Sequence, residues 1–341
     1  MGGDHGAAVL VPGLAQAARQ LGGEIRFLLH GDEETLKAEV ARHHGLADRA
    51  EIRHAPRVVA MDEKPAQALR RGKDSSMWNA VEAVKTGQAA AAISAGNTGA
   101  LMAISKLVLR MSADLDRPPL VASLPTRKGL ATFLDVGANV DCDAERLVEF
   151  AILGEAFHRA AHGVPKPTIG LLNVGHEDMK GHGEVREAHR ILREGGLDLD
   201  YRGFVEGDDL TRGVVDVIVT DGFTGNVALK TAEGAALFIR EELKKALTGS
   251  LFGRLGAFLA APALRKFRDR LSPPPAAPLL GLNGMVLKCH GGASARDFAE
   301  AVRVAVDLAR SDFAVEIERN MRKLPAALAE SIPPAADGAP E

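Results

Sequence analysis

The chain has 341 residues, of which 46% are hydrophobic and 26% charged, and its formal net charge is -3. This is ordinary globular composition, and a slightly acidic balance argues against nucleic acid as a partner. Two cysteines, Cys142 and Cys289, are too few for a secreted disulfide framework and favour a reducing cytosol. The first residues do not resemble a signal peptide, and no apolar run of about 18 residues predicts a membrane span. We therefore expect a cytoplasmic protein.

One pattern recurs along the chain: a short apolar run, a turn of glycine or small polar residues, and an amphipathic helical segment. The apolar runs cover residues 25–30, 89–93, 131–136, 168–174, 214–220 and 285–289. Helices are predicted from about residues 33, 98, 143 and 184, after residue 226 to about 247, and over 294–310. Apolar runs of this length suit strands buried on both faces, and their alternation with helices predicts βαβ units. The fold class is therefore α/β, a three-layer α/β/α sandwich with a mostly parallel sheet.

The turns of these units predict where a ligand binds. In open parallel sheets, ligands lie beyond the carboxyl ends of the strands, and each following helix directs its free N–H groups there. Several such ends together can hold an anion without many lysines. The alternative is that the small polar residues only make tight turns and cap helices. For the group as a whole we favour a binding cleft.

The most informative turn is Asp221-Gly222-Phe223-Thr224-Gly225-Asn226, between an apolar strand and a helix. Asp221, the Thr224 hydroxyl, the Gly225 backbone and the Asn226 amide could face a phosphate or an oxyanion. Asn226 could instead be only the N-cap of the helix.

Three further turns carry similar chemistry. The segment of residues 94–100 offers Ser94, Gly96, Asn97 and Thr98, and the segment of residues 135–141 offers Asp135 and Asn139. In the third, residues 173–181, Lys180 precedes a glycine and could neutralise phosphate as a point charge, although most lysines are simply solvated. His290 lies in a similar turn and is a weaker candidate for ligand contact.

Other site classes lack their signatures. The sequence contains no GxxxxGK[ST], no GxGxxG and no GxSxG motif, which argues against a P-loop, a dinucleotide site and a hydrolase nucleophile. It contains neither HExxH nor paired CxxC motifs, so we expect no metal and no cofactor.

The stretch of residues 248–272 interrupts the strand–helix rhythm and reads as an amphipathic helical hairpin. Its basic residues outnumber its acidic ones. Such a hairpin favours a membrane surface or an acidic protein partner, and its apolar face could equally pack in a dimer interface. The candidate contact residues are Leu255, Phe258, Leu259, Arg265, Lys266, Phe267, Arg268 and Arg270.

Six separated segments resemble one family in the same order along almost the whole chain. They are MGGD at residues 1–4, SAGNTGA at 94–100, LDVGANVDC at 134–142, GLLNVGHEDMKG at 170–181, DGFTGNVALK at 221–230 and PLLGLNG at 278–284. Together they are similar to bacterial phosphate acyltransferases of the PlsX type.

The resemblance implies an enzyme of fatty acid and phospholipid metabolism that converts acyl-ACP (acyl carrier protein) and inorganic phosphate to acyl phosphate. It also implies a homodimer that associates peripherally with the membrane. The implied fold is related to phosphotransacetylases and isopropylmalate dehydrogenases. The sequence itself shows no sharp linker, so we expect a single domain over residues 1–324, and the stretch over 325–341, rich in alanine and proline, is expected to fray. The family's active-site lysine and asparagine correspond to Lys180 and Asn226, and its helical hairpin corresponds to residues 248–272.

The sequence departs from the family pattern at three places. Family members usually have a strand before the MGGD loop, and its absence would leave neighbouring strand edges unpaired. A Tyr-Gly-Gly-type segment before PLLGLNG is replaced by residues 273–277, PPPAA, and the family's KSHG pattern appears as KCHG at residues 288–291.

The expected chemistry is direct attack of phosphate on the thioester, with Asn226 and backbone N–H groups stabilising the oxyanion and Lys180 holding phosphate. Neither cysteine has an evident base partner in the sequence. The rivals are a phosphotransacetylase that uses acyl-CoA, a metal- and NAD-dependent hydroxyacid dehydrogenase, and a non-catalytic membrane scaffold.

Overall fold

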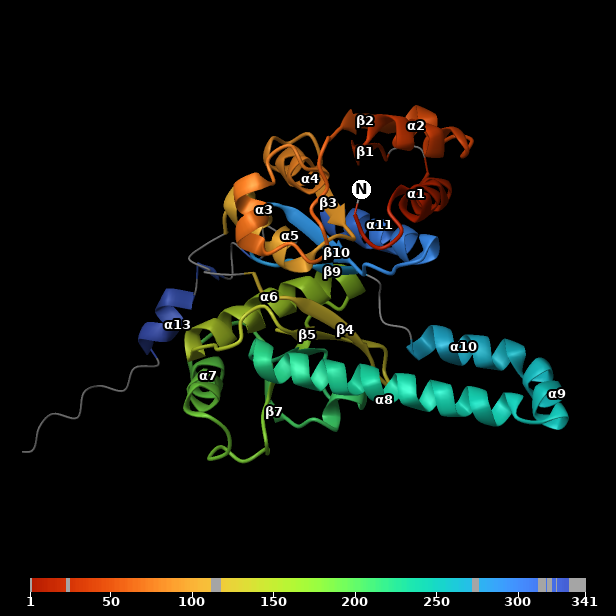
Figure 1. Ribbon diagram of the computed structural model, residues 1–341. Helices are drawn as coiled ribbons and strands as arrows, with labels where there is room; N and C mark the ends of the chain where they lie inside the picture. Colours follow the sequence, from red (N-terminus) through yellow and green to blue (C-terminus); the bar gives the residue numbers. More distant parts are fainter. Residues whose placement is uncertain are drawn as a thin grey trace, which may run out of the picture.

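The computed structural model describes residues 2–22, 25–111, 118–271 and 276–311, and near the C-terminus residues 317, 321–322 and 324–330, without the side chains of residues 269–271, 327, 329 and 330. Strands and helices alternate along most of this length (Figure 1). The strands are β1 (Phe27–Gly31), β2 (Ala50–His54), β3 (Ala91–Ser94), β4 (Val121–Pro125), β5 (Leu130–Leu134), β6 (Thr168–Leu172), β7 (Asp200–Val205), β8 (Val217–Val219), β9 (Ala276–Pro278) and β10 (Met285–Cys289).

The main helices that flank these strands are α1 (Ala7–Leu21), α2 (Glu33–Ala41), α3 (Pro65–Arg71), α4 (Ser76–Lys85), α5 (Thr98–Leu109), α6 (Ala144–His162), α7 (Gly183–Glu194), α8 (Gly222–Thr248) and α11 (Ala295–Arg310). Two short helices, α9 (Leu251–Leu259) and α10 (Ala261–Leu271), follow α8. The 3-10 turns are η1 (Ala47–Arg49) and η2 (Asp209–Thr211). Each strand predicted from an apolar run is present, and the α/β class is confirmed.

A five-stranded sheet with the order β4-β5-β8-β6-β7 forms one half of the molecule. Strands β5, β8, β6 and β7 are parallel, and β4 is antiparallel to β5. The three residues of β8 are all buried, which explains why its sequence is uniformly apolar. Helix α6 packs on this sheet with 13 buried residues, among them the fully buried Phe150. This sheet and α6 form the largest apolar core.

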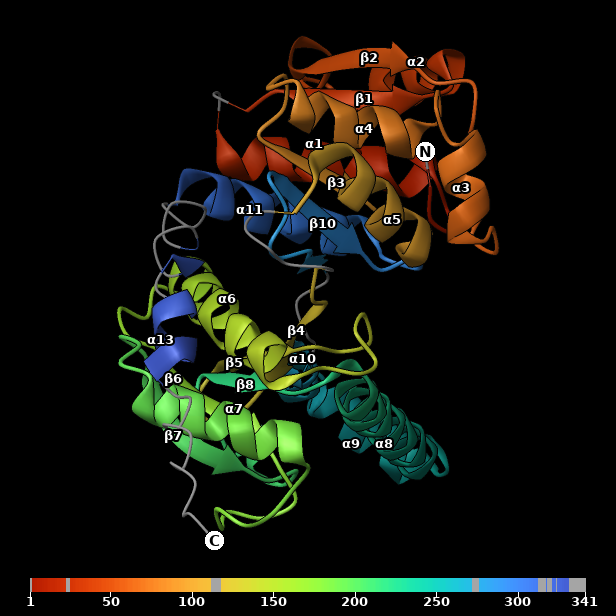
Figure 2. The same ribbon diagram turned by 90° about the vertical axis from the view of Figure 1, so that its left-hand side faces the viewer.

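The other half is built on a three-stranded sheet with the order β3-β10-β9, in which β3 and β10 are parallel. Helices α1 and α11 pack against each other beside it, and α4 and α5 lie on the other flank (Figures 1 and 2). The isolated bridge Leu120↔Leu279 connects the two halves, because Leu120 precedes β4 and Leu279 follows β9. The antiparallel strands β4 and β9 therefore meet where the two parallel sets adjoin.

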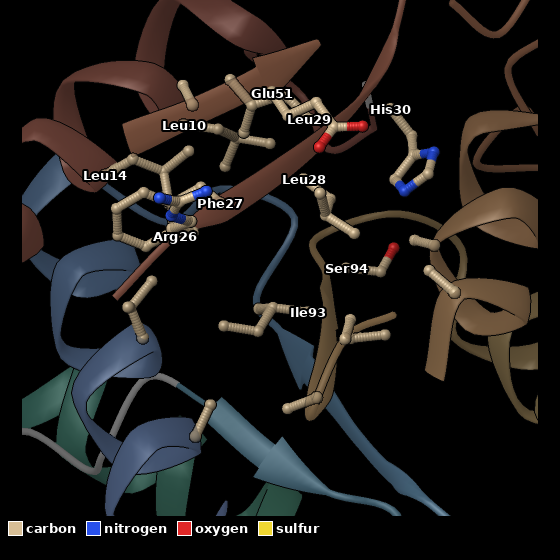
Figure 3. Close-up of a pocket in the computed structure, with 18 of the residues that line it drawn as sticks. Leu10, Leu14, Arg26, Phe27, Leu28, Leu29, His30, Glu51, Ile93 and Ser94 are labelled. Atoms are coloured by element: carbon tan, nitrogen blue, oxygen red, sulfur yellow. The ribbon is translucent and has the colours of Figure 1, made fainter. Parts of the chain in front are cut away.

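Strands β1 and β2 pair only with each other, so β1 and β3 do not pair among the residues described. A cavity of about 830 Å³ separates them (Figure 3). Leu28 of β1 and Ile93 of β3 line it, with apolar side chains of α1 and α11 such as Leu14 and Val302. The unpaired strand edges expected from the sequence are therefore found at β1 and β3.

The structure has helices in the segment predicted to form a hairpin. Helix α8 projects from the body, α9 lies at its far end, and α10 runs back from α9 toward the body (Figure 1). Along α8 only Gly222 and Gly225 are buried. Among the candidate contact residues, Phe258 is 76% exposed, Leu259 71%, Leu255 58% and Phe267 55%. Arg265, Lys266 and Arg268 are also exposed, whereas the side chain of Arg270 lies outside the described residues.

Two findings concern the C-terminal region and the membrane. The first part of the tail predicted to fray is helical, because α13 covers Leu324–Glu330, and residues 331–341 lie outside the described residues. Among the helices of the described ranges, none has the length and apolarity needed to cross a bilayer.

Gly154 allows α6 to approach the five-stranded sheet, and this contact gives a stability prediction. A Cβ at this position would lie 2.6 Å from Cγ1 of Val217 and 2.7 Å from Cδ1 of Leu134, both in the core. Gly154→Ala should therefore lower the free energy of unfolding by about 1–3 kcal/mol in denaturant titration. The control is Gly234→Ala in α8, where an added Cβ meets open space and helix propensity improves. A neutral Gly154→Ala would contradict this packing.

Candidate active site

The carboxyl ends of three adjacent parallel strands bring most of the predicted residues together. Strand β8 lies between β5 and β6, so the segments that follow them emerge at one edge of the sheet. These are residues 135–139 after β5, the start of α8 after β8, and residues 173–182 after β6, which we call the lysine loop. Asn226 and Lys180 therefore follow neighbouring strands.

Asp135 organises the first of these segments. Its side chain is fully buried, and Oδ1 accepts hydrogen bonds from the backbone N–H groups of Leu120 (3.0 Å), Gly137 (3.2 Å) and Ala138 (3.0 Å). Oδ2 accepts from the backbone N–H and the side-chain Nδ2 of Asn139, both at 2.7 Å. Five donors occupy the carboxylate. Asp135 and Asn139, predicted as substrate contacts, thus use these polar groups to shape the segment itself.

The start of α8 packs directly on this segment. A Cβ at Gly225 would lie 1.9 Å from the carbonyl oxygen of Asp135, and one at Gly222 would lie 2.6 Å from that of Asn139. The Gly222 N–H donates to this Asn139 oxygen at 2.7 Å. Only glycine permits such an approach, so both glycines of the turn serve packing between two active-site segments.

The sequence placed Thr224, Gly225 and Asn226 in a loop, but the helix already begins at Gly222. Asp221 is the N-cap, and its carboxylate accepts from the N–H and the hydroxyl of Thr224, each at 2.8 Å. The alternative that Asn226 is the N-cap is therefore wrong. The N–H groups of Gly222, Thr224 and Gly225 all have partners within the protein, so few backbone donors of this turn remain for an anion.

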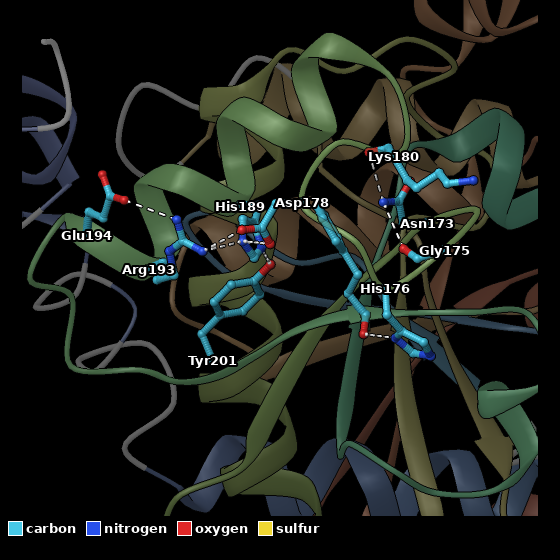
Figure 4. Close-up of polar contacts among 10 residues, drawn as sticks. Asn173, Gly175, His176, Asp178, Lys180, His189, Arg193, Glu194 and Tyr201 are labelled. Atoms are coloured by element: carbon cyan, nitrogen blue, oxygen red, sulfur yellow. Dashed lines mark hydrogen bonds and ion pairs between the residues drawn. The ribbon is translucent and has the colours of Figure 1, made fainter.

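Lys180 and Asn226 differ from these neighbours because their side chains make no hydrogen bond or ion pair within the described part of the chain. Both residues are exposed. The Asn226 carboxamide lies beside Gly137, where an added Cβ would be 3.5 Å from Oδ1. Lys180 extends away from the polar contacts that hold its loop (Figure 4). An ammonium and a carboxamide are thus available to a ligand at this edge.

The remaining predicted residues lie at the other sheet, at the carboxyl ends of β3 and β10. The Asn97 side chain donates to the carbonyls of Ala60, Met61 and Glu63 at 3.1, 3.0 and 2.8 Å and caps α5 through Ala100 N–H.

Asn97 is therefore a structural residue. Ser94 Oγ accepts from the N–H of Gly96 at 3.2 Å, and Gly96 itself is buried beside Gly2. Thr98 begins α5 and is half-buried, whereas His290 is exposed. These residues follow β3 and β10, and so they form a second cluster rather than extending the edge at β5, β8 and β6.

The two cysteine thiols are poorly suited to nucleophilic catalysis. Burial, with the nearby carboxylates of Asp135 and Asp221, raises the pKa of Cys142 to about 12. Burial raises the pKa of Cys289 to about 11. Both thiols therefore stay protonated at neutral pH, in agreement with the expectation from the sequence.

Sequence reasoning missed the residues that hold the lysine loop. Arg186, His189 and Arg193 of α7 contact it, and Asn173 spans it from within. The spacing of three and four residues in α7 placed these side chains on one helix face. That signal was present in the sequence, but nothing in it indicated which segment the face would contact.

Asp135 provides a second stability prediction. Asp135→Asn replaces an acceptor oxygen with an amide that opposes the surrounding donors, so unfolding should become easier by roughly 3 kcal/mol. Thermal or denaturant unfolding measures this. Asp141→Asn, at an exposed position three residues before α6 begins, is the control and should change stability by less than about 0.5 kcal/mol. Equal effects of the two substitutions would refute the role of Asp135.

Comparison with known proteins agrees with this architecture. Solved structures of a phosphotransacetylase from Streptococcus pyogenes (TM-score 0.58, 17% identity, 87% of this chain and 91% of that one) and of the EutD phosphotransacetylase from Staphylococcus aureus (TM-score 0.56, 15% identity, 88% and 99%) share the fold. At such low identity these matches show the fold alone.

Sequence comparison is more specific. A family model described as "Fatty acid synthesis protein" matches residues 1–316. The chain is 73% identical over 339 residues to the phosphate acyltransferase of Phenylobacterium zucineum, covering 99% of this chain and 97% of that protein. It is 62% identical over 331 residues to that of Caulobacter vibrioides, covering 96% and 92%. The chain therefore belongs to the PlsX family of phosphate acyltransferases, which confirms the resemblance read from its six motifs.

Proposed function

We propose that this protein transfers a long-chain fatty acyl group from acyl carrier protein to inorganic phosphate, giving acyl phosphate for phospholipid synthesis. One observation carries the proposal. At the edge where β5, β8 and β6 end, Asp135, Asn139, Asp221 and Thr224 are engaged within the protein, and the Lys180 ammonium and the Asn226 carboxamide are left available. A cation and a neutral donor on neighbouring segments suit a phosphate beside a carbonyl.

The reaction needs no covalent enzyme intermediate, because a thioester is already activated. A phosphate oxygen attacks the carbonyl carbon and forms a new C–O bond, and the carbonyl oxygen becomes an oxyanion. The C–S bond then breaks, and the leaving thiolate takes up the proton that hydrogen phosphate loses. Acyl phosphate and the free thiol of the carrier are the products. The high pKa values of both cysteines agree with a mechanism that does not use them.

In this mechanism Lys180 holds phosphate and offsets its charge, and Asn226 donates to the oxyanion. The sequence analysis also gave this second task to backbone N–H groups. Three N–H groups at the start of α8 already have partners within the protein. The Asn226 side chain therefore contributes more to stabilising the oxyanion than these backbone groups do. Loss of one such donor typically costs about 3 kcal/mol of transition-state stabilisation.

The first functional prediction concerns these two residues. Lys180→Ala and Asn226→Ala should each lower the rate of acyl phosphate formation from palmitoyl-ACP and phosphate at least about a hundredfold, with unchanged thermal stability. Mass spectrometry of the product measures the rate. Lys166→Ala, which removes an exposed lysine paired with Asp198, is the control and should keep full activity. Near-normal turnover in both active-site variants would overturn the assignment.

The same assay separates the donors. If the enzyme requires the carrier protein, acyl-CoA in place of acyl-ACP should give little product. Preferred use of acetyl-CoA would instead identify a phosphotransacetylase. Activity that requires NAD and a divalent metal would point to the dehydrogenase alternative instead.

We assign carrier docking to the exposed basic residues Arg265, Lys266 and Arg268 of α10, since carrier proteins are generally acidic. Exposed charges are screened by salt over about 10 Å at 0.1 M. The Michaelis constant for acyl-ACP should therefore rise with ionic strength, while that for phosphate rises less. Steady-state kinetics across a salt series measures both. A salt-independent constant for acyl-ACP would exclude this docking surface.

We further propose a homodimer and a peripheral membrane contact. Exposed apolar side chains in the middle of α8, among them Leu237, Phe238 and Ile239, suit packing by a second copy. Those of α9, such as Phe252 at 88% exposed, suit the lipid interface. Such a protein would work in the cytoplasm at the inner membrane face.

A further inference from the structure

The lysine loop, residues 173–182, is held by polar contacts rather than by apolar packing. Val174 is 76% exposed and Met179 is 85% exposed. Inside the loop, the Asn173 side chain donates to the carbonyls of Gly175 (3.2 Å) and Lys180 (3.1 Å). Since so little of the loop is buried, its conformation depends on polar side chains of neighbouring elements that contact it.

Side chains on one face of α7 make these contacts. Arg186, His189 and Arg193 are three and four residues apart, so their side chains share a face. The Arg186 guanidinium donates to the Gly181 carbonyl at 3.0 Å, directly after Lys180. Arg193 donates to the Asp178 carboxylate at 3.2 Å, and Nε2 of His189 lies 3.5 Å from the same carboxylate (Figure 4). These contacts flank Lys180 on both sides along the chain.

His189 is the central member of this set. It is 7% exposed, its ring stacks on Phe204 with centroids 4.3 Å apart, and its Nδ1 lies 2.6 Å from the hydroxyl of Tyr201, the only tyrosine of the chain. Burial and the Arg193 guanidinium lower the pKa of His189, although Asp178 and Glu194 act in the opposite direction. The ring is therefore neutral at neutral pH.

A neutral imidazole needs one donor and one acceptor, and this site supplies both. The Tyr201 hydroxyl can donate or accept at Nδ1. On the other side, Nε2 lies 3.5 Å from the Asp178 carboxylate, and Arg193 Nη1, 3.3 Å away, donates to Nε2 when Nε2 carries no proton. Tyr201 on β7, His189 on α7 and Asp178 in the loop thus connect the sheet to the loop.

We propose that Tyr201, His189 and Arg193 are positioning residues that set the place of the Lys180 ammonium through Asp178. None of their contacts involves Lys180 itself, whose side chain extends away from them. They tether the backbone from which Lys180 projects. This inference rests on the proposed role of Lys180 in phosphate binding.

A matched pair of variants tests the inference. Arg193→Gln removes the contact to Asp178, whereas Arg190→Gln, on the same helix, removes only ion pairs to Glu187 and Glu194. Tyr201→Phe removes a single hydroxyl and preserves the ring. Arg193→Gln and Tyr201→Phe should raise the Michaelis constant for phosphate about tenfold or more and leave that for acyl-ACP unchanged. Arg190→Gln should leave both unchanged.

Two further measurements separate positioning from general loss of structure. Amide hydrogen exchange at residues 175–181 should accelerate in Arg193→Gln and Tyr201→Phe but not in Arg190→Gln. In a Lys180→Ala background, adding Tyr201→Phe should not raise the Michaelis constant for phosphate further, because both changes act through the Lys180 ammonium.

Three results would overturn the inference. The first is an unchanged Michaelis constant for phosphate in Arg193→Gln. The second is that Tyr201→Phe raises this constant as much in the Lys180→Ala background as in the wild-type protein, and the third is unchanged amide hydrogen exchange in the lysine loop of both variants. Failure of the proposed function gives a different result: wild-type protein forms no acyl phosphate, or Lys180→Ala retains full activity, whatever the exchange data show.

Discussion

The candidate active site depends on the buried carboxylate of Asp135. Five hydrogen-bond donors converge on it, all but one from the four residues that follow it. A buried charge is tolerated only when it is fully satisfied, and here its satisfaction fixes the turn after β5 in one conformation. The start of α8 then packs on this turn through Gly225, with no space for a larger side chain. Asn226 is held in place because the turn beneath it is rigid.

This arrangement distinguishes two sets of polar residues: those whose polar groups are bonded within the fold, and those whose side chains have no partner in the described structure. Asp221 caps α8, Asn97 joins residues 60–63 to α5, and Asn139 completes the Asp135 cluster. All are residue types common in ligand sites, yet their polar groups are used within the fold. Lys180 and Asn226 have no such internal partner in the described structure, and this difference supports the proposal that they contact substrate.

The two halves of the molecule achieve stability differently. The five-stranded sheet is continuous and is covered by α6, whose central residues are fully buried. In the other half, the cavity between β1 and β3 interrupts the sheet, and α1 and α11 pack across it. Helices α8, α9 and α10 carry apolar side chains that remain exposed in the described structure. An exposed surface of that kind is usual where a protein meets a partner or a lipid interface.

The sequence by itself determined the α/β class, the strand–turn–helix units and the turns that carry the site, because periodicity and turn chemistry act over a few residues. Its six motifs also identified the family. The tertiary structure decided how polar groups are used: Asp135 and Asn97 are structural, and Asn226 lies within α8, at the start of its second turn. It also placed His189 against Asp178. These outcomes depend on partners brought together from distant strands and helices, and a pattern of neighbouring residues does not specify which of them will meet.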